Sequence, residues 1–528
     1  MQGRYLLWVV LGIGSMASPV AGAGVNAAPA PSSTTIHDIQ FMGNRIIDSA
    51  TLEKRLSIKR EGFFDPSQVN FSRDVIKSIY QDKGYEDVQI STRTTALAHE
   101  RVDVVFSIDE GPLYRIRTVT IQGNHLISDK LVQRDLKIKP GQPFSPTQVY
   151  EGNKNLFRSG YFESINIHYS TAPAHQMDIQ VNLKERPTQY AKGGFGYGTE
   201  TKERVSIGYE DRNFFGNEKQ LDVSAIHSGF LTDPQKYRTS ILETSLAQPH
   251  FLGTSFEGQT SISEEWDDRE AYNAQTTAWR SSLGRRFGDH ITASLRYRFQ
   301  GTDLTRIDPS ASSTTLPYTD VSAVGPTFSY DNTNDPFLPT VGWRVSSLLE
   351  KGLTLGVGDI AFQRFEARAG RFETIHQVTF FAGLQFGIVR PDNPNDSIPI
   401  FERYSLGGAN TVRGYEQEEL GPRDAQNNPL GGNAFAVGNL EVRHTLYKKL
   451  AGVWFLDGGQ LYTQPIGKEW PYIQAKSLGD FAYGTGPGLR LNTPVGAVRL
   501  ELGYKLNPPP GEDLFDRLAI DFSLGEVF

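Results

Sequence analysis

The chain has 528 residues, more than one ordinary domain needs, and a net charge of -7 that gives no support to nucleic-acid binding. It has no cysteine, which excludes a disulfide framework and any thiolate metal site. Its 52 glycines, 22 tyrosines and 31 phenylalanines favour many short strands with aromatic belts.

The first 23 residues have the pattern of a secretory signal peptide. Arg4 supplies positive charge, residues 5–16 form a short apolar stretch, and residues 21–23 (Ala-Gly-Ala) form a small-residue cleavage site. The alternative, a membrane anchor, is disfavoured because a spanning helix needs about 20 apolar residues. No later stretch is apolar for that long, so any membrane crossing must be made by strands.

Two repeats, over 36–111 and 112–188, follow a flexible lead-in over 24–35. Each is expected to contain a strand, two helices and two further strands, and the second helix should begin at Pro66 or Pro146, because proline suits a first helical turn. The first copy should carry the longer second helix. The pairs that recur at an offset of 80 residues include Gly43 and Gly123, Leu56 and Leu136, Phe64 and Phe144, and Val69 and Val149.

This order of elements resembles the POTRA module. An open sheet edge in that module can accept an extended segment of a client protein, through main-chain hydrogen bonds. The resemblance implies that the two repeats bind clients. The alternative is a pair of spacer domains.

From residue 189 to 528 the sequence predicts 16 short strands. The strand over 498–506 is typical, because apolar residues alternate with Arg499, Glu501 and Lys505, and such a charged face suits a wet lumen better than a soluble core. The expected fold is therefore periplasmic α+β POTRA repeats followed by a 16-stranded antiparallel transmembrane β-barrel in the bacterial outer membrane.

The last strand, over 518–528, supports this fold. Its alternation gives one apolar and one wetter face, and the chain ends on an aromatic residue. An edge strand of a soluble sandwich is the alternative, but such a strand normally avoids a bare apolar edge. The terminal signal comprises Ile520, Phe522, Leu524 and Phe528.

A long connection over 391–431 is expected to have a function, because loops of this length are uncommon in compact domains. Arg413 lies in it between glycines and could fold inward to meet carboxylates on the lumen wall. Glu441 and Asp457 have the right parity on the next two strands. A guanidinium that bridges two carboxylates in a partly dry lumen makes strong, directional bonds.

The same loop carries a family resemblance. Residues Val412, Arg413, Gly414 and Tyr415 look like the Val-Arg-Gly-Phe/Tyr signature of the BamA/TamA superfamily of POTRA-barrel proteins. The segment over 454–458 resembles that family's second motif, in which the aspartate is Asp457. The resemblance covers nearly the whole chain after residue 23.

This resemblance implies an outer-membrane assembly factor that receives unfolded β-barrel clients on its POTRA domains and helps to insert them into the lipid bilayer. Candidate partners besides the clients are a periplasmic tethering protein and accessory lipoproteins, with no nucleic acid. The alternative function is a two-partner secretion transporter that exports a partner protein through the lumen. A passive porin is disfavoured, because porins carry no POTRA repeats.

The resemblance also implies a lateral gate between the first and last strands. Glycine weakens strands because it loses more entropy and has no side chain to pack, so closure should be least stable there. A crosslink between Phe195 and Ser523 is a first trial pair for this seam. The gate glycines are Gly193, Gly194, Gly196, Gly198 and Gly525.

No enzyme site is expected. The ten histidines show no metal-ligand spacing, and no nucleophile or phosphate-loop motif appears, so no cofactor, metal or catalytic residue is predicted. The acidic residues Glu416, Glu418 and Glu419 are predicted to form a solvated face of the long loop.

Overall fold

The computed structural model describes residues 34–524, except for 201, 217, 230–236, 308–315, 337, 355–357, 395, 448, 463–479, 494–495 and 509–510. The predicted signal peptide, nearly all of the lead-in, Gly525 and Phe528 lie outside the described residues. Two compact units divide the chain near residue 185. Among the described helices, none has both the length and the apolar character needed to cross a bilayer.

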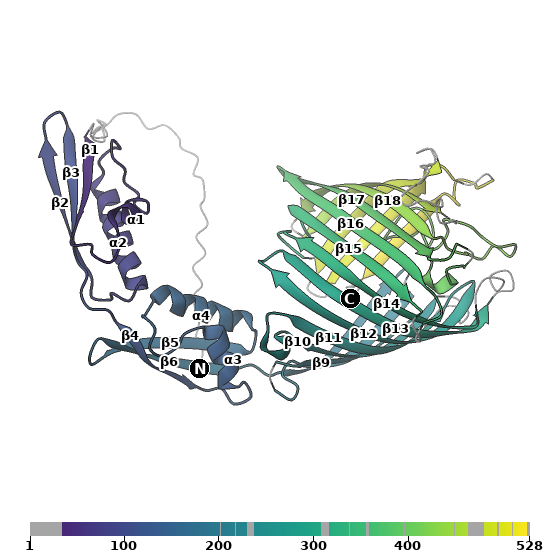
Figure 1. Cartoon of the computed structure of the whole chain (residues 1–528). Helices are drawn as coiled ribbons and strands as arrows, with labels where there is room; N and C mark the ends of the chain where they lie inside the picture. The colour runs from purple at the N-terminus through teal and green to yellow at the C-terminus, as the bar shows by residue number, and fades with distance from the viewer. Residues whose placement is uncertain are drawn as a thin grey trace, which may run out of the picture. The chain divides into compact units, whose positions relative to one another are not determined.

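The first repeat contains β1 (Thr35–Met42), α1 (Ser49–Glu53), α2 (Pro66–Asp82), β2 (Gln89–Leu97) and β3 (Arg101–Asp109), as Figure 1 shows. Its three-stranded sheet has the order β1-β3-β2, with β1 parallel and β2 antiparallel to β3. Helix α2 begins at Pro66, and the Asp65 side chain caps it by accepting from the backbone N–H of Ser67. Ile76, Val104 and Phe106 are fully buried where the helix packs on the sheet.

The second repeat has the same order of elements: β4 (Arg115–Gln122), α3 (Asp129–Leu136), α4 (Pro146–Arg158), β5 (Phe162–Ala172) and β6 (Gln176–Glu185), with the sheet order β4-β6-β5. Helix α2 has 17 residues and α4 has 13, so the first copy does carry the longer second helix. Gly43 and Gly123 recur because each has φ +86°, and a Cβ there would collide with a carbonyl oxygen of the neighbouring strand.

The rest of the chain forms a closed barrel of 16 antiparallel strands, as predicted (Figure 1). Its strands are β7 (Gln189–Gly198), β8 (Lys202–Asp211), β9 (Gln220–Ser228), β10 (Arg238–Gln248), β11 (Glu257–Asp268), β12 (Tyr272–Phe287), β13 (Ile291–Ile307), β14 (Tyr318–Asp331), β15 (Gly342–Leu353), β16 (Phe362–Ile375), β17 (Val378–Pro391), β18 (Ala434–Tyr447), β19 (Leu450–Tyr462), β20 (Ala482–Thr493), β21 (Gly496–Lys505) and β22 (Leu518–Leu524).

The two faces of the barrel wall invert the distribution of a soluble protein. Apolar side chains such as Leu384 and Ile262 are exposed on the outside, by 69% and 62%. Charged side chains such as Glu441 and Glu501 are buried inside. This alternation is typical of a barrel that faces lipid on the outside and a polar lumen within.

The barrel closes between β22 and β7. Among the described residues, which end at Leu524, only two pairs join these strands: Ser523 with Gly198 and Leu524 with Tyr197. The backbone N–H of Thr199 adds a bond of 3.0 Å to the carbonyl of Phe522. The neighbouring strands β7 and β8 pair along their whole length, from residue 189 to residue 211.

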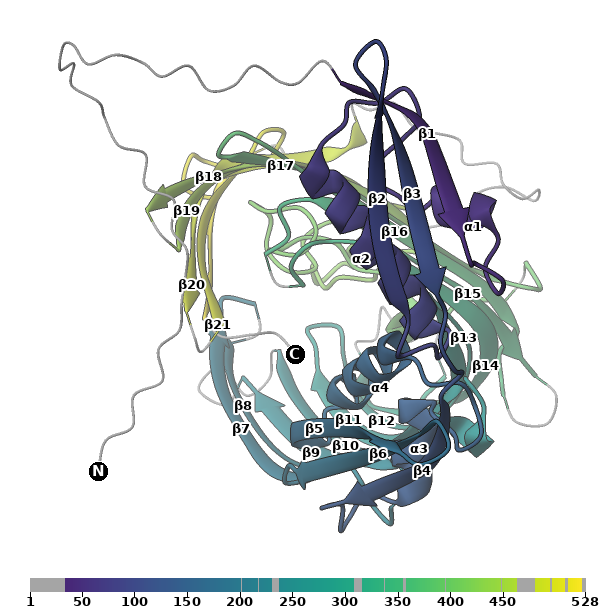
Figure 2. The same ribbon diagram turned by 90° about the vertical axis from the view of Figure 1, so that its left-hand side faces the viewer.

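The connection between β17 and β18 folds back inside the barrel, where Figure 2 shows it in yellow-green within the ring of strands. It contains the short helix η3 (Ile400–Glu402). We call residues 392–433 the lumen loop. Its buried side chains Leu406, Val412 and Tyr415 pack against Phe435 and Val437 of β18.

Candidate functional site

The centre of the site is Arg413, which the lumen loop carries to the wall formed by β18, β19 and β21. The Arg413 side chain forms a two-pronged ion pair with Asp457, from Nε to Oδ2 at 2.6 Å and from Nη2 to Oδ1 at 2.7 Å. The backbone N–H of Arg413 donates to the same carboxylate at 3.1 Å. Asp457 is completely buried, so this pairing takes place out of contact with water.

Glu441 lies on the other side of the guanidinium, with its Oε1 2.7 Å from Nη1 of Arg413. The structure thus brings Arg413 together with the two carboxylates that strand parity selected. The strand register explains their meeting: Asn439 of β18 is opposite Asp457 of β19, and Glu441 is one inward position further along. The Asn439 amide donates to Oδ1 of Asp457 at 2.8 Å and to the carbonyl of Thr411 at 2.9 Å, which fixes both carboxylate and loop.

Further partners complete the site. Glu501 of β21 lies 3.3 Å from Nη1 of Arg413, and Arg490 of β20 bridges Glu441 at 2.9 Å and Glu501 at 2.6 Å. Arg443 of β18 adds a third cation 2.7 Å from Glu441. Three guanidinium groups therefore balance three carboxylates. The parity that placed Glu501 inward was visible in the sequence, but Arg490 was not identified.

An aromatic ring supports the guanidinium from its face. The Arg413 guanidinium carbon lies 3.8 Å from the centre of the Phe455 ring, which is itself fully buried. Burial acts to lower the pKa of Arg413, but the hydrogen bonds and the charge of Asp457 outweigh it and raise the pKa. Arg413 is therefore a permanent cation in a dry, charge-balanced site.

Glycines on the barrel wall allow the loop to approach it so closely. A Cβ on Gly484 of β20 would collide with the carbonyl oxygen of Arg413, and one on Gly503 of β21 would collide with the backbone of Gly414. Gly414 itself has φ +97°, which favours glycine. Because these wall residues have no side chain, the backbone of the loop packs directly against the backbone of β20 and β21.

The predicted solvated acidic face of the loop is correct for Glu416, which is exposed, but wrong for Glu418 and Glu419. Glu418 pairs with Arg269 at 2.9 Å, and Glu419 pairs with Lys505 of β21. The prediction failed because the spacing of charges within a loop does not reveal cations that approach from the barrel wall. These pairs add two more attachments between the loop and the barrel.

The loop also contacts the first hairpin of the barrel. The backbone N–H of Ala409 donates to Glu200, in the turn between β7 and β8, and a Cβ on Gly408 would collide with the same carboxylate. Burial raises the pKa of Glu200 to about 7. The neighbouring residue, Thr199, bonds to β22, so this turn contacts both the loop and the seam.

The predicted gate glycines lie along β7. Apart from its chain neighbours, no described residue lies within 4 Å of a Cβ placed on Gly193, whereas a Cβ on Gly194 would lie 2.6 Å from the Ser206 hydroxyl oxygen of β8. Gly196 faces the carbonyl of Leu524 in β22, and Gly198 is the residue paired with Ser523. The trial crosslink pair is therefore out of register, because Ser523 lies opposite Gly198 and not opposite Phe195.

The side chains of the terminal strand signal follow the same alternation. Ile520 is 62% exposed on the outer face of β22, and Phe522 and Leu524 share its parity. The ring of Phe522 lies 6.1 Å from that of Tyr197 across the seam.

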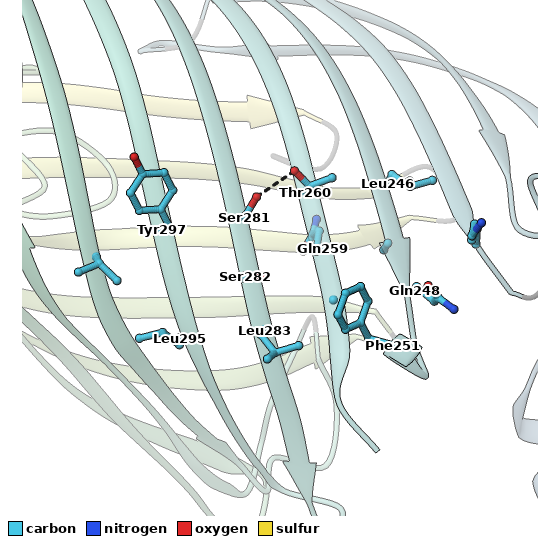
Figure 3. A pocket seen from close by; sticks show the side chains of 14 residues that line it. Leu246, Gln248, Phe251, Gln259, Thr260, Ser281, Ser282, Leu283, Leu295 and Tyr297 are labelled. Carbon is cyan, nitrogen blue, oxygen red and sulfur yellow. Dashed lines mark hydrogen bonds between the residues drawn. The ribbon is translucent and has the colours of Figure 1, made fainter. Parts of the chain in front are cut away.

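A groove of about 400 Å³ lies elsewhere, on the outward face of β10–β13 (Figure 3). Leu246, Leu283, Leu295 and Phe251 contribute to its lining, and the Ser281 and Thr260 hydroxyl groups bond at 2.9 Å. The groove is part of the lipid-facing surface and contains no residue of the Arg413 site.

Family comparisons cover almost all of the described chain. Residues 189–528 match the Omp85 superfamily domain. Residues 34–111 and 114–186 match the POTRA family, described as the surface antigen variable number repeat. The POTRA match therefore covers the two repeats, and the Omp85 match covers the barrel.

Similar proteins include the outer membrane protein assembly factor BamA of Nitratidesulfovibrio vulgaris, 28% identical over 466 residues that cover 86% of this chain and 56% of that protein. The chain thus spans little more than half the length of this curated relative. In fold, it resembles BamA from Haemophilus ducreyi lacking POTRA domains 1-3, with a TM-score of 0.73, 18% identity, and coverage of 92% of this chain and 99% of that one. CdiB from Acinetobacter baumannii has a TM-score of 0.50 at 14% identity, covering 93% of this chain and 89% of that one.

Proposed function

Because the chain belongs to the Omp85 superfamily, we propose that it is an assembly factor that helps to insert unfolded β-barrel clients into the outer membrane. The barrel lies in that membrane, and the two POTRA repeats lie in the periplasm. The single observation that carries the proposal is the buried attachment of the lumen loop through Arg413, Asp457 and Glu441. It holds the loop within the lumen, where Ala409 contacts the turn between β7 and β8, next to the seam.

In this proposal the seam between β22 and β7 is a lateral gate. Among the described residues the pairs Ser523–Gly198 and Leu524–Tyr197 join the strands, and the main-chain hydrogen bonds of this seam would have to break for the wall to part. Once parted from β22, strand β7 would offer its N–H and C=O groups to a client strand. Gly193 and Gly194 weaken β7, because glycine has no side chain to pack.

The POTRA repeats are proposed to receive clients before insertion. Strand β2 lies at an edge of the first sheet, and β5 lies at an edge of the second. Edge strands present a row of main-chain donors and acceptors that an extended client segment can pair with, independently of its sequence. A tethering protein and accessory lipoproteins would be further partners of these repeats.

Depletion of the protein from cells tests this function. The outer membrane should lose many different barrel proteins, because a general assembly factor serves many clients. If one secreted protein disappears while the barrel inventory stays unchanged, the protein is a secretion transporter and the proposal fails.

A further inference from the structure

A second group of buried ion pairs holds the lumen loop, far along the wall from Arg413. At its centre is Glu402, the last residue of η3. Arg298 of β13 meets Glu402 with two nitrogens, Nη1 to Oε1 at 2.7 Å and Nη2 to Oε2 at 3.2 Å. Arg364 of β16 reaches Oε2 of Glu402 at 2.6 Å and its backbone carbonyl at 2.8 Å.

Further side chains of the barrel wall surround the Glu402 carboxylate. Glu350 of β15 lies 3.0 Å from Arg298, so it balances part of the positive charge, and the Gln300 amide lies 3.3 Å from Glu402. Glu350 and Glu402 are both nearly inaccessible, with side chains exposed by 2% and 3%. Two-pronged arginine pairs of this kind are strong and directional.

Apolar packing fixes the same part of the loop. Ile398 is buried with Val321, Phe362 and Val389 of the wall. Ile400 is buried with residues of β12 and β13 in a separate cluster. The loop base therefore has its own small core besides its ion pairs.

The two attachments use different strands. Glu402 binds β13 and β16, whereas Arg413 binds β18, β19 and β21. Between them the loop turns at Gly407 and Gly408, whose φ values of +113° and +94° favour glycine. A pair of glycines thus separates two anchors that share no strand.

We propose that Glu402 is a positioning residue: it is the fixed anchor of the lumen loop, and the segment from Gly407 to Gly414 swings about it when Arg413 leaves its site. This inference deepens the role of the loop in the proposed function. Two anchors that bind different strands and have no ion-pair partner in common should act nearly independently.

The absence of cysteine from the sequence makes single-cysteine labelling a direct test. Two buried reporters are used in separate full-length proteins: Ile398→Cys beside the Glu402 anchor and Val412→Cys beside Arg413. The rate of reaction with a maleimide is measured on the purified, folded protein in lipid vesicles. No client is present, so failure here leaves the assembly function itself standing.

Arg413→Ala should raise the labelling rate of Val412→Cys by about tenfold or more and change that of Ile398→Cys by less than about twofold, because only one local unit opens. Glu402→Gln should do the reverse, and the combined variant should raise both rates. The matched control is Glu373→Gln, which alters an exposed pair with Arg371 on the same barrel and should change neither rate.

Release of both reporters by Arg413→Ala alone would overturn the proposal, because the Glu402 anchor would then not hold independently of Arg413. So would an unchanged Ile398→Cys rate in Glu402→Gln. If Glu402→Gln does not fold, as judged by heat-modifiable migration on gels, Arg298→Lys takes its place. It keeps the charge but loses the two-pronged geometry, and it should raise the Ile398→Cys rate in the same direction.

Discussion

Removal of the Arg413 side chain is the most informative perturbation of the site. In Arg413→Ala, Glu441 keeps Arg443 at 2.7 Å and Arg490 at 2.9 Å, so its charge stays compensated. Asp457 loses its two-pronged partner and is left with neutral donors such as the Asn439 amide. One fully buried carboxylate then lacks a cation.

Breaking a buried ion pair in this way costs about 3–5 kcal/mol in the free energy of unfolding. Because Arg413 and Asp457 are exposed by only 4% and 0%, little solvent screening reduces that cost. Arg413→Lys should also lose stability, since an ammonium cannot reproduce the fork that binds both oxygens of Asp457. The change should be smaller than for alanine, because the charge is retained.

The assay is urea unfolding of the full-length protein in lipid vesicles, with wild type and Glu373→Gln as references. Asp457→Asn in the Arg413→Ala background removes the uncompensated charge, so the double variant should be less destabilised than the sum of the two single variants. If Arg413→Ala unfolds within about 0.5 kcal/mol of wild type, the level of an ordinary surface substitution, the reasoning about a buried lock is wrong.

Four other predictions follow from the same structure. Gly484→Val should release the loop as Arg413→Ala does, because the new side chain occupies the space of the loop backbone; maleimide labelling of a loop cysteine measures this, and an unchanged rate would contradict it. Tyr197→Cys with Leu524→Cys, a pair in register, should form a disulfide that blocks client assembly until reductant is added, and activity of the crosslinked protein would argue against a gate. Deletion of residues 36–187 should leave a barrel that inserts but assembles no clients; full activity would make the repeats spacers. Because burial raises the folded-state pKa of Glu200 to about 7 from 4.5, its contribution to stability should be full below pH 4.5 and lost as the pH rises through 7, and Glu200→Gln should remove that dependence in unfolding measurements.

The sequence predicted the features that follow from strand periodicity. Alternation placed Glu441 and Asp457 on the lumen face, and neighbouring strands pair in sequence order, so their meeting with a loop arginine could be expected. Repetition at a fixed offset likewise predicted the two POTRA repeats, down to Gly43 and Gly123. In both cases the prediction depends on a pattern within the sequence itself: alternation along a strand, or repetition at a fixed offset.

The contacts that the sequence did not predict depend on the path that the lumen loop takes through the barrel, or on how the barrel closes. Glu402 meets Arg298 only because the loop returns across the lumen to β13, more than 100 residues earlier in the chain. No periodicity encodes that path, and the same is true of Glu418 and Arg269. The pairing of Ser523 with Gly198 depends on how the barrel closes, which the pattern within either strand does not determine.

The most direct test of the proposed assembly function is reconstitution of the full-length protein in lipid vesicles with a urea-unfolded outer-membrane barrel as client. The rate at which the client becomes folded and protease-protected is compared with that in vesicles that contain the Arg413→Ala variant at the same level. The wild-type protein should accelerate insertion and the variant should do so poorly. Equal rates with wild-type protein and with empty vesicles would contradict the account.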